Sequence, residues 1–293
     1  MLTNTFSHIP GIGLITERRL WESGSRSWDD FVEPYPNTLS SGKIALIKNH
    51  IDLSQKHLAY QPEYFADLLT PDQHWRLFPH FRHSTAFLDI ETTGLDKWGD
   101  SITTIALYDG GSIFHYVQGD NLEAFKEDIQ KYQVIVTYNG KCFDVPFIES
   151  YLGIRIEQVH IDLRYILKRL GYSGGLKGCE RQLGLHRGEL DGVDGYFAVL
   201  LWEEFKRTNS RNALETLLAY NIMDTVNLEY LMVIAYNLNL QKTPFFQSHC
   251  LTVPEAPDIP FRADPRIIDK IKREWGPPIS FPLKRILMTE TGF

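Results

Sequence analysis

The feature that most constrains the fold is a short apolar run that ends in two acidic residues. Residues 85–90 read Thr-Ala-Phe-Leu-Asp-Ile, and Glu91 follows directly. Such a run predicts a buried strand, and residues two apart on a strand point to the same face of a sheet. Asp89 and Glu91 should therefore project together at the strand end, where buried carboxylates need a partner. Cations would provide one, although a plain surface strand end explains an isolated acidic pair equally simply.

Regular elements predicted around this strand indicate an α/β fold, in which a mixed sheet is flanked by helices. An Asp-Gly-Gly turn at residues 109–111 predicts a hairpin. The further predicted strands span residues 101–108, 112–117, 133–138 and 158–161. The predicted helices span residues 121–131, 144–152, 162–170, 176–184, 195–208 and 211–236.

The ends of the chain differ from this α/β domain, which we place at residues 84–236. Residues 1–83 predict a helical N-terminal extension, with two short helices around tight turns near residues 9–31 and another helix near 40–58. The extension closes with a link through three prolines, Pro62, Pro71 and Pro79.

Residues 237–293 form a Pro-rich C-terminal tail. Eight of the fifteen prolines lie between Pro244 and Pro282, which predicts an irregular segment with one short helix near residues 265–274.

Composition narrows the cellular setting and the partners. Three cysteines without CxxC spacing indicate neither a disulfide framework nor a zinc knuckle, so a reducing cytoplasm is expected. No apolar run approaches the roughly 20 residues of a membrane span, so no membrane partner is expected. The net charge of −7 argues at first against nucleic acid. The segment 155–187, however, has seven basic residues against three acids, and it could line a strand-binding groove or form a solvated helix face.

Two further acidic positions come later in the chain. Asp144 follows a predicted strand and loop, where the next helix should begin, and a helix N-cap alone would explain it. Tyr220 and Asp224 are four apart in a long apolar-periodic helix and share a face. Taken alone, they would fit a core tyrosine and a surface acid. The order of the three signals along the chain makes a common site the better interpretation.

The three signals together resemble the DEDD exonuclease superfamily, which has the ribonuclease H-like fold. The resemblance lies in Phe-Leu-Asp-Ile-Glu-Thr-Thr-Gly-Leu at residues 87–95, Thr-Tyr-Asn-Gly-Lys-Cys-Phe-Asp-Val-Pro-Phe at 137–147, and Tyr-Asn-Ile-Met-Asp at 220–224. The second motif looks like the proofreading domain of family B DNA polymerases. The whole is most similar to prokaryotic stand-alone ribonuclease H-like proteins. Tyr at position 220, where another branch has His, resembles the DEDDy branch.

The resemblance implies a site, a chemistry and a substrate. It implies that Asp89, Glu91, Asp144 and Asp224 hold two divalent cations about 4 Å apart, Mg²⁺ or Mn²⁺, with Tyr220 beside the attacking water. All five residues would be catalytic. The expected reaction is hydrolysis of single-stranded DNA or RNA from a 3′ end to 5′-mononucleotides. The residues expected to bind this substrate are Thr92, Gly94, Leu95, Asn139 and Phe143.

The N-terminal extension contains a Gly-rich turn, Gly11-Ile12-Gly13, that resembles a helix-hairpin-helix element. By that resemblance it would contact the backbone of a duplex without reading its sequence. Such turns also serve as plain helix connectors.

Two alternatives to a nuclease remain open. One is a non-catalytic nucleic-acid-binding or partner-binding module on the same fold, and the other is a metal-dependent phosphoesterase acting on small nucleotides.

Overall fold

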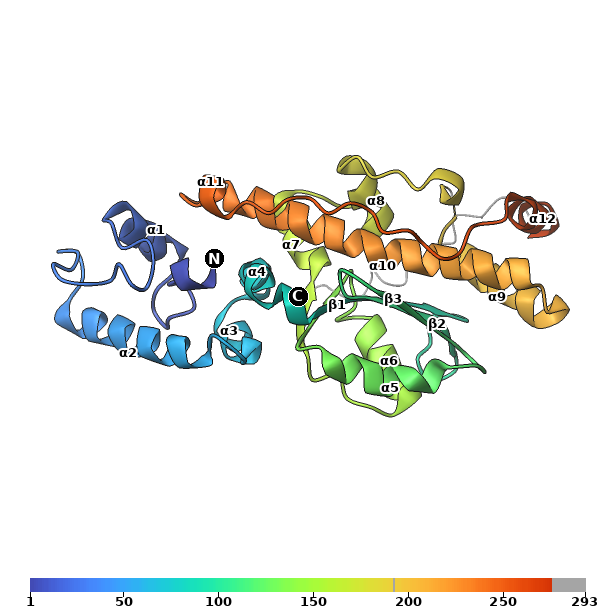
Figure 1. Ribbon diagram of the computed structural model, residues 1–293, viewed down its shortest axis with the longest axis horizontal. Coiled ribbons are helices and arrows are strands. Elements are labelled where there is room, and N and C mark those ends of the chain that lie inside the picture. Colours follow the sequence, from blue (N-terminus) through green and yellow to red (C-terminus); the bar gives the residue numbers. More distant parts are fainter. Residues whose placement is uncertain (192, 276–293) are drawn as a thin grey trace, which may run out of the picture.

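The centre of the computed structural model, which describes residues 1–191 and 193–275, is a five-stranded mixed sheet (Figure 1). The strand order is β3-β2-β1-β4-β5. β1 pairs with β2, and β2 with β3, in antiparallel fashion, whereas β1 pairs with β4, and β4 with β5, in parallel. The α/β prediction is therefore confirmed. The strands are β1 (Thr85–Thr92), β2 (Ile102–Tyr108), β3 (Ile113–Val117), β4 (Val134–Thr137) and β5 (Val159–Asp162).

Side chains of β1 alternate between two apolar layers. Ala86, Leu88 and Ile90 belong to a core that also contains Phe125 and Phe147. These two residues lie on the helices below the sheet in Figure 1, α5 (Phe125–Asp128) and α6 (Asp144–Leu152). Because the side-chain period of a strand is two, Asp89 and Glu91 face the opposite layer.

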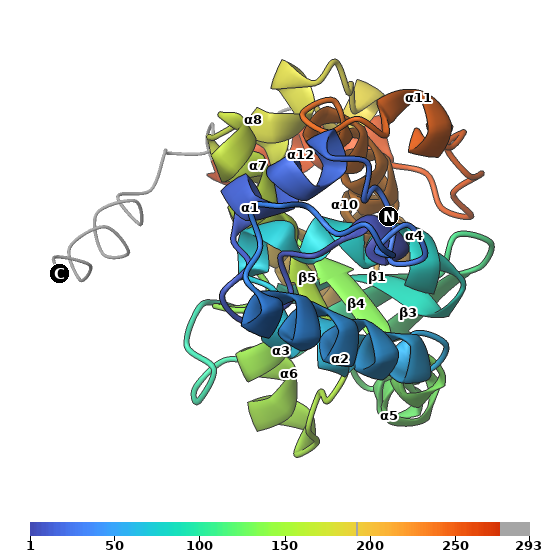
Figure 2. The same ribbon diagram turned by 90° about the vertical axis from the view of Figure 1, so that its left-hand side faces the viewer.

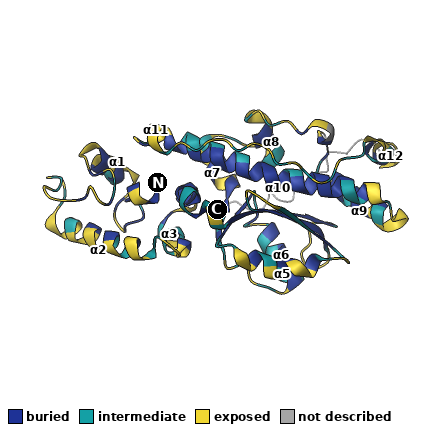
Figure 3. Ribbon diagram, in the orientation of Figure 1, coloured by how far each residue is buried: buried dark blue, intermediate teal, exposed yellow. Residues whose placement is uncertain are grey.

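The opposite layer is dominated by α10 (Arg211–Leu240), which packs on β1, β2 and β4. Of its 30 residues, 21 are buried. Most of the helix is therefore in the dark blue of buried residues in Figure 3. Ser210 caps it by accepting a hydrogen bond from the Ala213 N–H at 3.3 Å. The other helices of this layer are α7 (Leu163–Leu170), α8 (Gly175–Gln182) and α9 (Gly195–Thr208).

The predicted helix over residues 121–131 is interrupted. The chain forms the single-turn helix α5 between two short 3-10 helices, η4 (Leu122–Ala124) and η5 (Ile129–Lys131). Its apolar residues Leu122, Phe125 and Ile129 are nevertheless buried against the sheet. The spacing of these residues correctly indicates the packed face, but not the continuity of the helix.

The N-terminal extension is helical, and Figure 2 shows its helices in front of the edge of the sheet. Its first α-helix is α1 (Leu14–Glu22), followed by α2 (Ser41–His57). The second of the two helices predicted before residue 31 is absent from the structure. Residues 23–31 instead form turns, in which Asp30 accepts hydrogen bonds from the backbone N–H and hydroxyl of Ser27 at 2.8 Å.

The proline link is largely helical, like the rest of the extension. Each of its three prolines occupies the first or second position of a short helix, where a missing N–H costs nothing. The prolines therefore mark helix starts. These elements are α3 (Pro62–Leu68), the 3-10 helix η2 (Pro71–Arg76), α4 (Phe78–Phe81) and the 3-10 helix η3 (Arg82–Ser84).

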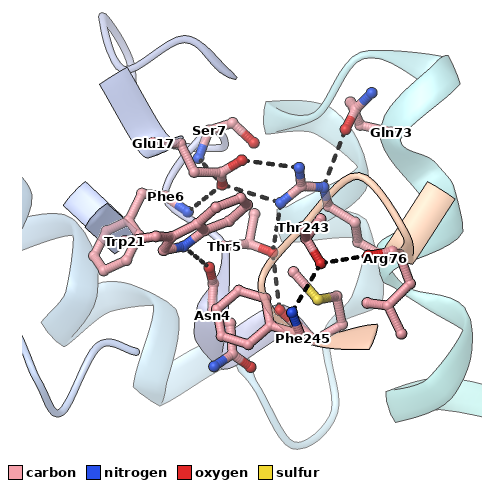
Figure 4. Close-up of polar contacts among 12 residues, drawn as sticks. Asn4, Thr5, Phe6, Ser7, Glu17, Trp21, Gln73, Arg76, Thr243 and Phe245 are labelled. Carbon is pink, nitrogen blue, oxygen red and sulfur yellow. Dashed lines mark hydrogen bonds and ion pairs between the residues drawn. The ribbon is translucent and has the colours of Figure 1, made fainter. Parts of the chain in front are cut away.

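A buried ion pair fastens α1 to η2. Both amino groups of Arg76 contact the two carboxylate oxygens of Glu17, at 3.0 and 2.8 Å. The Glu17 carboxylate also accepts hydrogen bonds from the backbone N–H groups of Phe6 and Ser7, at 2.7 and 2.9 Å, as Figure 4 shows. Both side chains are almost inaccessible, and their charges cancel within the pair.

The tail follows α10 as an irregular segment with two helices, α11 (Phe246–His249) and α12 (Pro265–Trp275). The helix expected near residues 265–274 is therefore found. Ile268 and Ile271 of α12 are buried in the core shared by the extension and α10. The rest of the predicted tail, residues 276–293, lies outside the described residues. No described helix has both the length and the apolar character needed to cross a bilayer.

Candidate metal centre

Three carboxylates meet between the end of β1 and the middle of α10. One oxygen from each of Asp89, Glu91 and Asp224 lies within 4.8 Å of the others. Glu91 and Asp224 are 8% and 6% exposed, and Asp89 is partly exposed. The strand places the first two on one face, and the helix crossing that face provides the third. No other such group of three or more metal-ligating side chains occurs in the described part of the chain.

Asn221 fixes the orientation of Asp89. Its amide nitrogen donates to Asp89 Oδ2 at 2.8 Å, and its amide oxygen accepts from the Thr104 hydroxyl at 3.0 Å. Asn221 and Thr104 are completely buried. Because both ends of the amide are used, the Asp89 carboxylate is held by a chain of hydrogen bonds that starts on β2.

Asp144, the fourth predicted ligand, lies beside this group but outside the set of three. Its Oδ1 accepts the backbone N–H of Ile90, the residue between Asp89 and Glu91, at 3.3 Å. It is 4% exposed and is the first residue of α6. The N-cap position of α6 is occupied by Phe143, so Asp144 is not the capping residue of this helix.

The loop before Asp144 is held by Asp162 at the end of β5. Asp162 accepts the backbone N–H groups of Asn139 and Lys141 at 2.8 and 3.1 Å, and it also caps α7 through the Arg164 N–H at 3.0 Å. Asn139 has a positive φ of 67° and accepts a hydrogen bond from Arg164 through its side-chain oxygen. Asn139 therefore supports the loop in this structure.

Negative charge accumulates in the group, and burial makes it costly. Burial and the charges of Asp224, Asp144 and Glu91 raise the pKa of Asp89 well above its usual range. Burial and Asp224 likewise raise the pKa of Glu91, and burial raises the pKa of Asp144 to about 7. Buried carboxylates at this density are the donor set that hard divalent cations prefer, so the residues fit the expected metals.

Two basic side chains also lie close to the site, Arg187 against a carboxylate and Lys177 against Tyr220, and their place there was not predicted. Arg187 forms an ion pair with Asp224, and its other nitrogens contact Glu180 at 2.7 Å. Lys177 lies with its Nζ 4.3 Å from the centre of the Tyr220 ring and contacts its hydroxyl. In the sequence both are simply members of the basic segment 155–187. Their charge was the available signal, but nothing local indicated that they turn inward.

Tyr220 is buried next to the carboxylates, one helical turn before Asp224, and is only 2% exposed. Burial, Asp224 and Glu91 raise its pKa well above the usual value. The phenol therefore stays protonated at neutral pH and can donate a hydrogen bond. Burial also lowers the pKa of its neighbour Lys177.

A pocket of about 360 Å³ lies between the loop after β1 and the start of α6. Leu95 and Phe143, two of the predicted substrate contacts, are among its lining residues, together with Trp98. Trp98 is 80% exposed and Leu95 is 53% exposed. The sequence did not indicate an exposed tryptophan on the loop that follows β1.

Thr92 and Gly94 shape that loop instead of lining the pocket. The Thr92 hydroxyl donates to the Gly94 carbonyl at 2.5 Å. A Cβ at Gly94 would meet the Asp100 carboxylate at 2.7 Å or less. Asp100 in turn accepts the Thr93 hydroxyl and the Asp96 N–H. Glycine is therefore required for the loop to close around Asp100.

The Gly-rich turn of the extension lies at the surface, before α1. Gly11 has a φ of +77°, and Gly11 and Gly13 are exposed, whereas Ile12 is buried. The short 3-10 helix η1 (Leu2–Asn4) and further turns precede it. The element thus has a hairpin and a following α-helix, but no α-helix before the hairpin.

Comparison with known proteins identifies a family and a likeness to a solved structure. Residues 86–236 match the family RNase_H_2, described as the RNase_H superfamily. No curated protein sequence is similar enough to match the chain. The solved structure of the family B DNA polymerase from the hyperthermophilic archaeon Pyrobaculum calidifontis is similar to it with a TM-score of 0.41 and 18% identity. The likeness covers 57% of this chain and 27% of the polymerase, so the chain spans about a quarter of that protein's length.

Proposed function

Because the chain belongs to the RNase H superfamily, we propose that it is a metal-dependent nuclease that releases 5′-mononucleotides from the 3′ ends of single-stranded nucleic acid. Members of this superfamily are commonly hydrolytic nucleases that use divalent metals. The observation that carries the proposal is the convergence of Asp89, Glu91 and Asp224, whose oxygens lie within 4.8 Å of one another. The DEDDy assignment is part of the proposal, and it rests on Tyr220 in the third motif.

The carboxylates would hold two Mg²⁺ or Mn²⁺ ions, with Asp144 as the fourth ligand. Bound there, the ions would supply an activated water and neutralise the charge that develops on the phosphate. The protein contributes the orientation of the ligands. Asn221 holds Asp89 in place, and the Ile90 N–H holds Asp144, so little reorganisation is needed when substrate binds.

Tyr220 would orient the attacking water through its hydroxyl. Its buried, protonated phenol suits a hydrogen-bond donor better than a base. Lys177, in contact with that hydroxyl, fixes the position of the phenol and adds a positive charge beside the phosphate position. The expectation from the sequence was that Tyr220 lies beside the attacking water, and the proposal adds the role of hydrogen-bond donor.

The pocket beside Asp144 would hold the terminal nucleotide. Leu95, Phe143 and Trp98 line it, and stacking of a base on an aromatic side chain is worth about 1–3 kcal/mol. Because any base has a face to stack, such a pocket binds unpaired ends with little regard to sequence. This supports single-stranded ends as the substrate.

A non-catalytic nucleic-acid-binding module is the second candidate, and one observation favours it. Arg187 already pairs with Asp224, so it competes with a cation for that carboxylate. A protein in which the arginine persists there would bind nucleic acid without cleaving it.

The test is hydrolysis of a 5′-labelled 20-nucleotide single strand in Mn²⁺, with Asp89→Ala and Asp224→Ala as variants. We expect stepwise shortening to 5′-mononucleotides, and a loss of rate of at least about 10³-fold in each variant, as for removal of other essential catalytic groups. Asp52→Ala, an exposed acid on α2, is the matched control and should have the rate of the natural protein.

Four results separate the alternatives. Full activity in either active-site variant would contradict the proposed site. Cleavage of a circular strand would contradict exonuclease action, and turnover of mononucleotide esters alone would indicate a small-molecule phosphoesterase. Binding of the strand without any metal-dependent turnover would indicate the non-catalytic module.

A further inference from the structure

A cleft lies between α1 and the segment that follows α10, far from the carboxylates. It consists of two adjoining cavities, of about 150 and 460 Å³. Arg18, Trp21, Lys242 and Thr243 line both cavities, so the two form one continuous surface. We call it the N-terminal cleft.

Its walls are fixed by buried contacts. Trp21 donates from its ring nitrogen to the Asn4 carbonyl at 2.9 Å and packs edge-on against Phe245 at 5.2 Å (Figure 4). The ion pair between Glu17 and Arg76 joins α1 to η2 directly beneath. The two sides of the cleft therefore belong to one packed unit, and the cleft does not need a ligand to form.

Positive charge is concentrated in this cleft, although the whole chain has a net charge of −7. Two acids, Glu17 and Glu22, are among its lining residues. Its five basic residues are Arg18, Arg26, Arg76, Arg169 and Lys242.

Three of these basic side chains are uncompensated. Arg76 is neutralised by Glu17, and Arg169 pairs with Asp72 outside the cleft. Arg18, Arg26 and Lys242 are exposed and form no ion pair within the described ranges. Unpaired cations gathered in a cleft attract an anionic ligand, since low-dielectric walls focus their field.

The helix α1 lies along the cleft, since its first and last residues, Leu14 and Glu22, both line it. Two adjoining cavities make the cleft elongated, which suits an extended polyanion better than a small anion. We infer that the N-terminal cleft binds the phosphodiester backbone of the nucleic acid whose 3′ end enters the carboxylate site.

This inference rests on the proposed function, and the length of α10 makes it quantitative. The cleft begins where α10 ends at Leu240, and Asp224 lies on the same helix. The helix rise places them about 24 Å apart along its axis. A single strand that keeps the stacking of a duplex has one phosphate every ~3.4 Å, so about seven nucleotides of such a strand separate the two sites. A stacked strand shorter than this cannot occupy both.

The experiment compares strands of 5 and 30 nucleotides by fluorescence anisotropy without divalent cations, over a range of salt. In Arg18→Ala/Lys242→Ala we expect about tenfold weaker binding of the 30-mer. The log–log slope of its binding against salt concentration should become shallower by about 1.4, as for two lost phosphate contacts on a single strand. The affinity for the 5-mer should differ far less. Lys43→Ala/Lys56→Ala removes the same charge from the exposed face of α2 and is the matched control.

Several outcomes would overturn the inference. Equal losses in the two double variants would show a general charge effect, and unchanged binding of the 30-mer would show that the cleft takes no part. Polyglutamate that competes as well as an oligonucleotide of equal charge would indicate a docking surface for an acidic protein segment. Because binding is measured without turnover, a failure here is distinguishable from a failure of the proposed nuclease activity, which the wild-type hydrolysis assay tests alone.

Discussion

Two regions of the molecule bury charged groups, and they do so in opposite ways. Around Glu17, one carboxylate meets one guanidinium and two backbone N–H groups, so every charge is matched. Around Asp89, four carboxylates lie close together, and the pKa values of three of them are raised by burial. Lys177 and Arg187 offset part of that excess.

The difference separates a structural use of charge from a functional one. A matched buried pair adds specificity to packing, and its charges need no further partner from solvent or a ligand. An unmatched group of carboxylates costs stability, and a fold tolerates it only where a ligand later supplies the missing positive charge. The same carboxylate-to-amide substitution should therefore have opposite consequences in the two regions.

The largest effect is expected at the matched pair. Glu17→Gln leaves Arg76 buried without its counter-charge, and such a loss costs about 3–5 kcal/mol of unfolding free energy. Denaturant unfolding followed by circular dichroism measures this change. The exposed Glu22 on the same helix is the control, and Glu22→Gln should change stability by less than about 0.5 kcal/mol. A Glu17→Gln protein as stable as the natural one would show that the pair is not a structural requirement.

The next effect concerns cations. Mn²⁺ at a hundredfold excess over its Kd should raise the unfolding free energy by about 2.7 kcal/mol, since it binds only the folded site. The increment should persist in Glu17→Gln, provided that this variant folds, and disappear in Asp224→Asn. Thermal unfolding with and without Mn²⁺ measures this increment in each variant. An equal increment in Asp224→Asn would place the bound metal elsewhere.

The smallest effect has the opposite sign to the first. In the absence of divalent metal, Asp89→Asn should raise the unfolding free energy by about 1 kcal/mol, because it removes one of several mutually repelling carboxylates. An asparagine can still accept the hydrogen bond from Asn221. Denaturant unfolding in EDTA measures the gain. Destabilisation by Asp89→Asn would mean that Lys177 and Arg187 already balance the site, and the contrast between the regions would fail.

Local patterns in the sequence were sufficient for much of the fold. The two-residue spacing of Asp89 and Glu91 predicted that they share one face of β1, and the long apolar period predicted α10. Both succeed because the information lies within a few residues of each side chain. The short helices of the proline link were not predicted individually. Pro62, Pro71 and Pro79 start them, and in a sequence a proline that starts a helix looks like one that prevents it.

The site was only partly accessible from the sequence. Asp89 and Glu91 are neighbours on one strand, so their proximity could be inferred, and the approach of Asp224 depended on the order of the motifs. Arg187 and Lys177 could not be placed, because their partners are 37 and 43 residues away along the chain. Contacts over such separations depend on how the segment around α8 folds back on α10, and no periodicity encodes that.

The single long helix α10 has a consequence for how this protein can change over generations. It carries Tyr220 and Asp224 near its middle and ends beside the N-terminal cleft. One residue inserted between those points would turn everything beyond it by about 100° and advance it by 1.5 Å. Surface loops elsewhere can lengthen freely. This helix can gain or lose residues only in nearly whole turns, for example about seven residues for two turns, because only then does its far end keep its orientation. Its length should therefore vary less among descendants of this chain than any loop does.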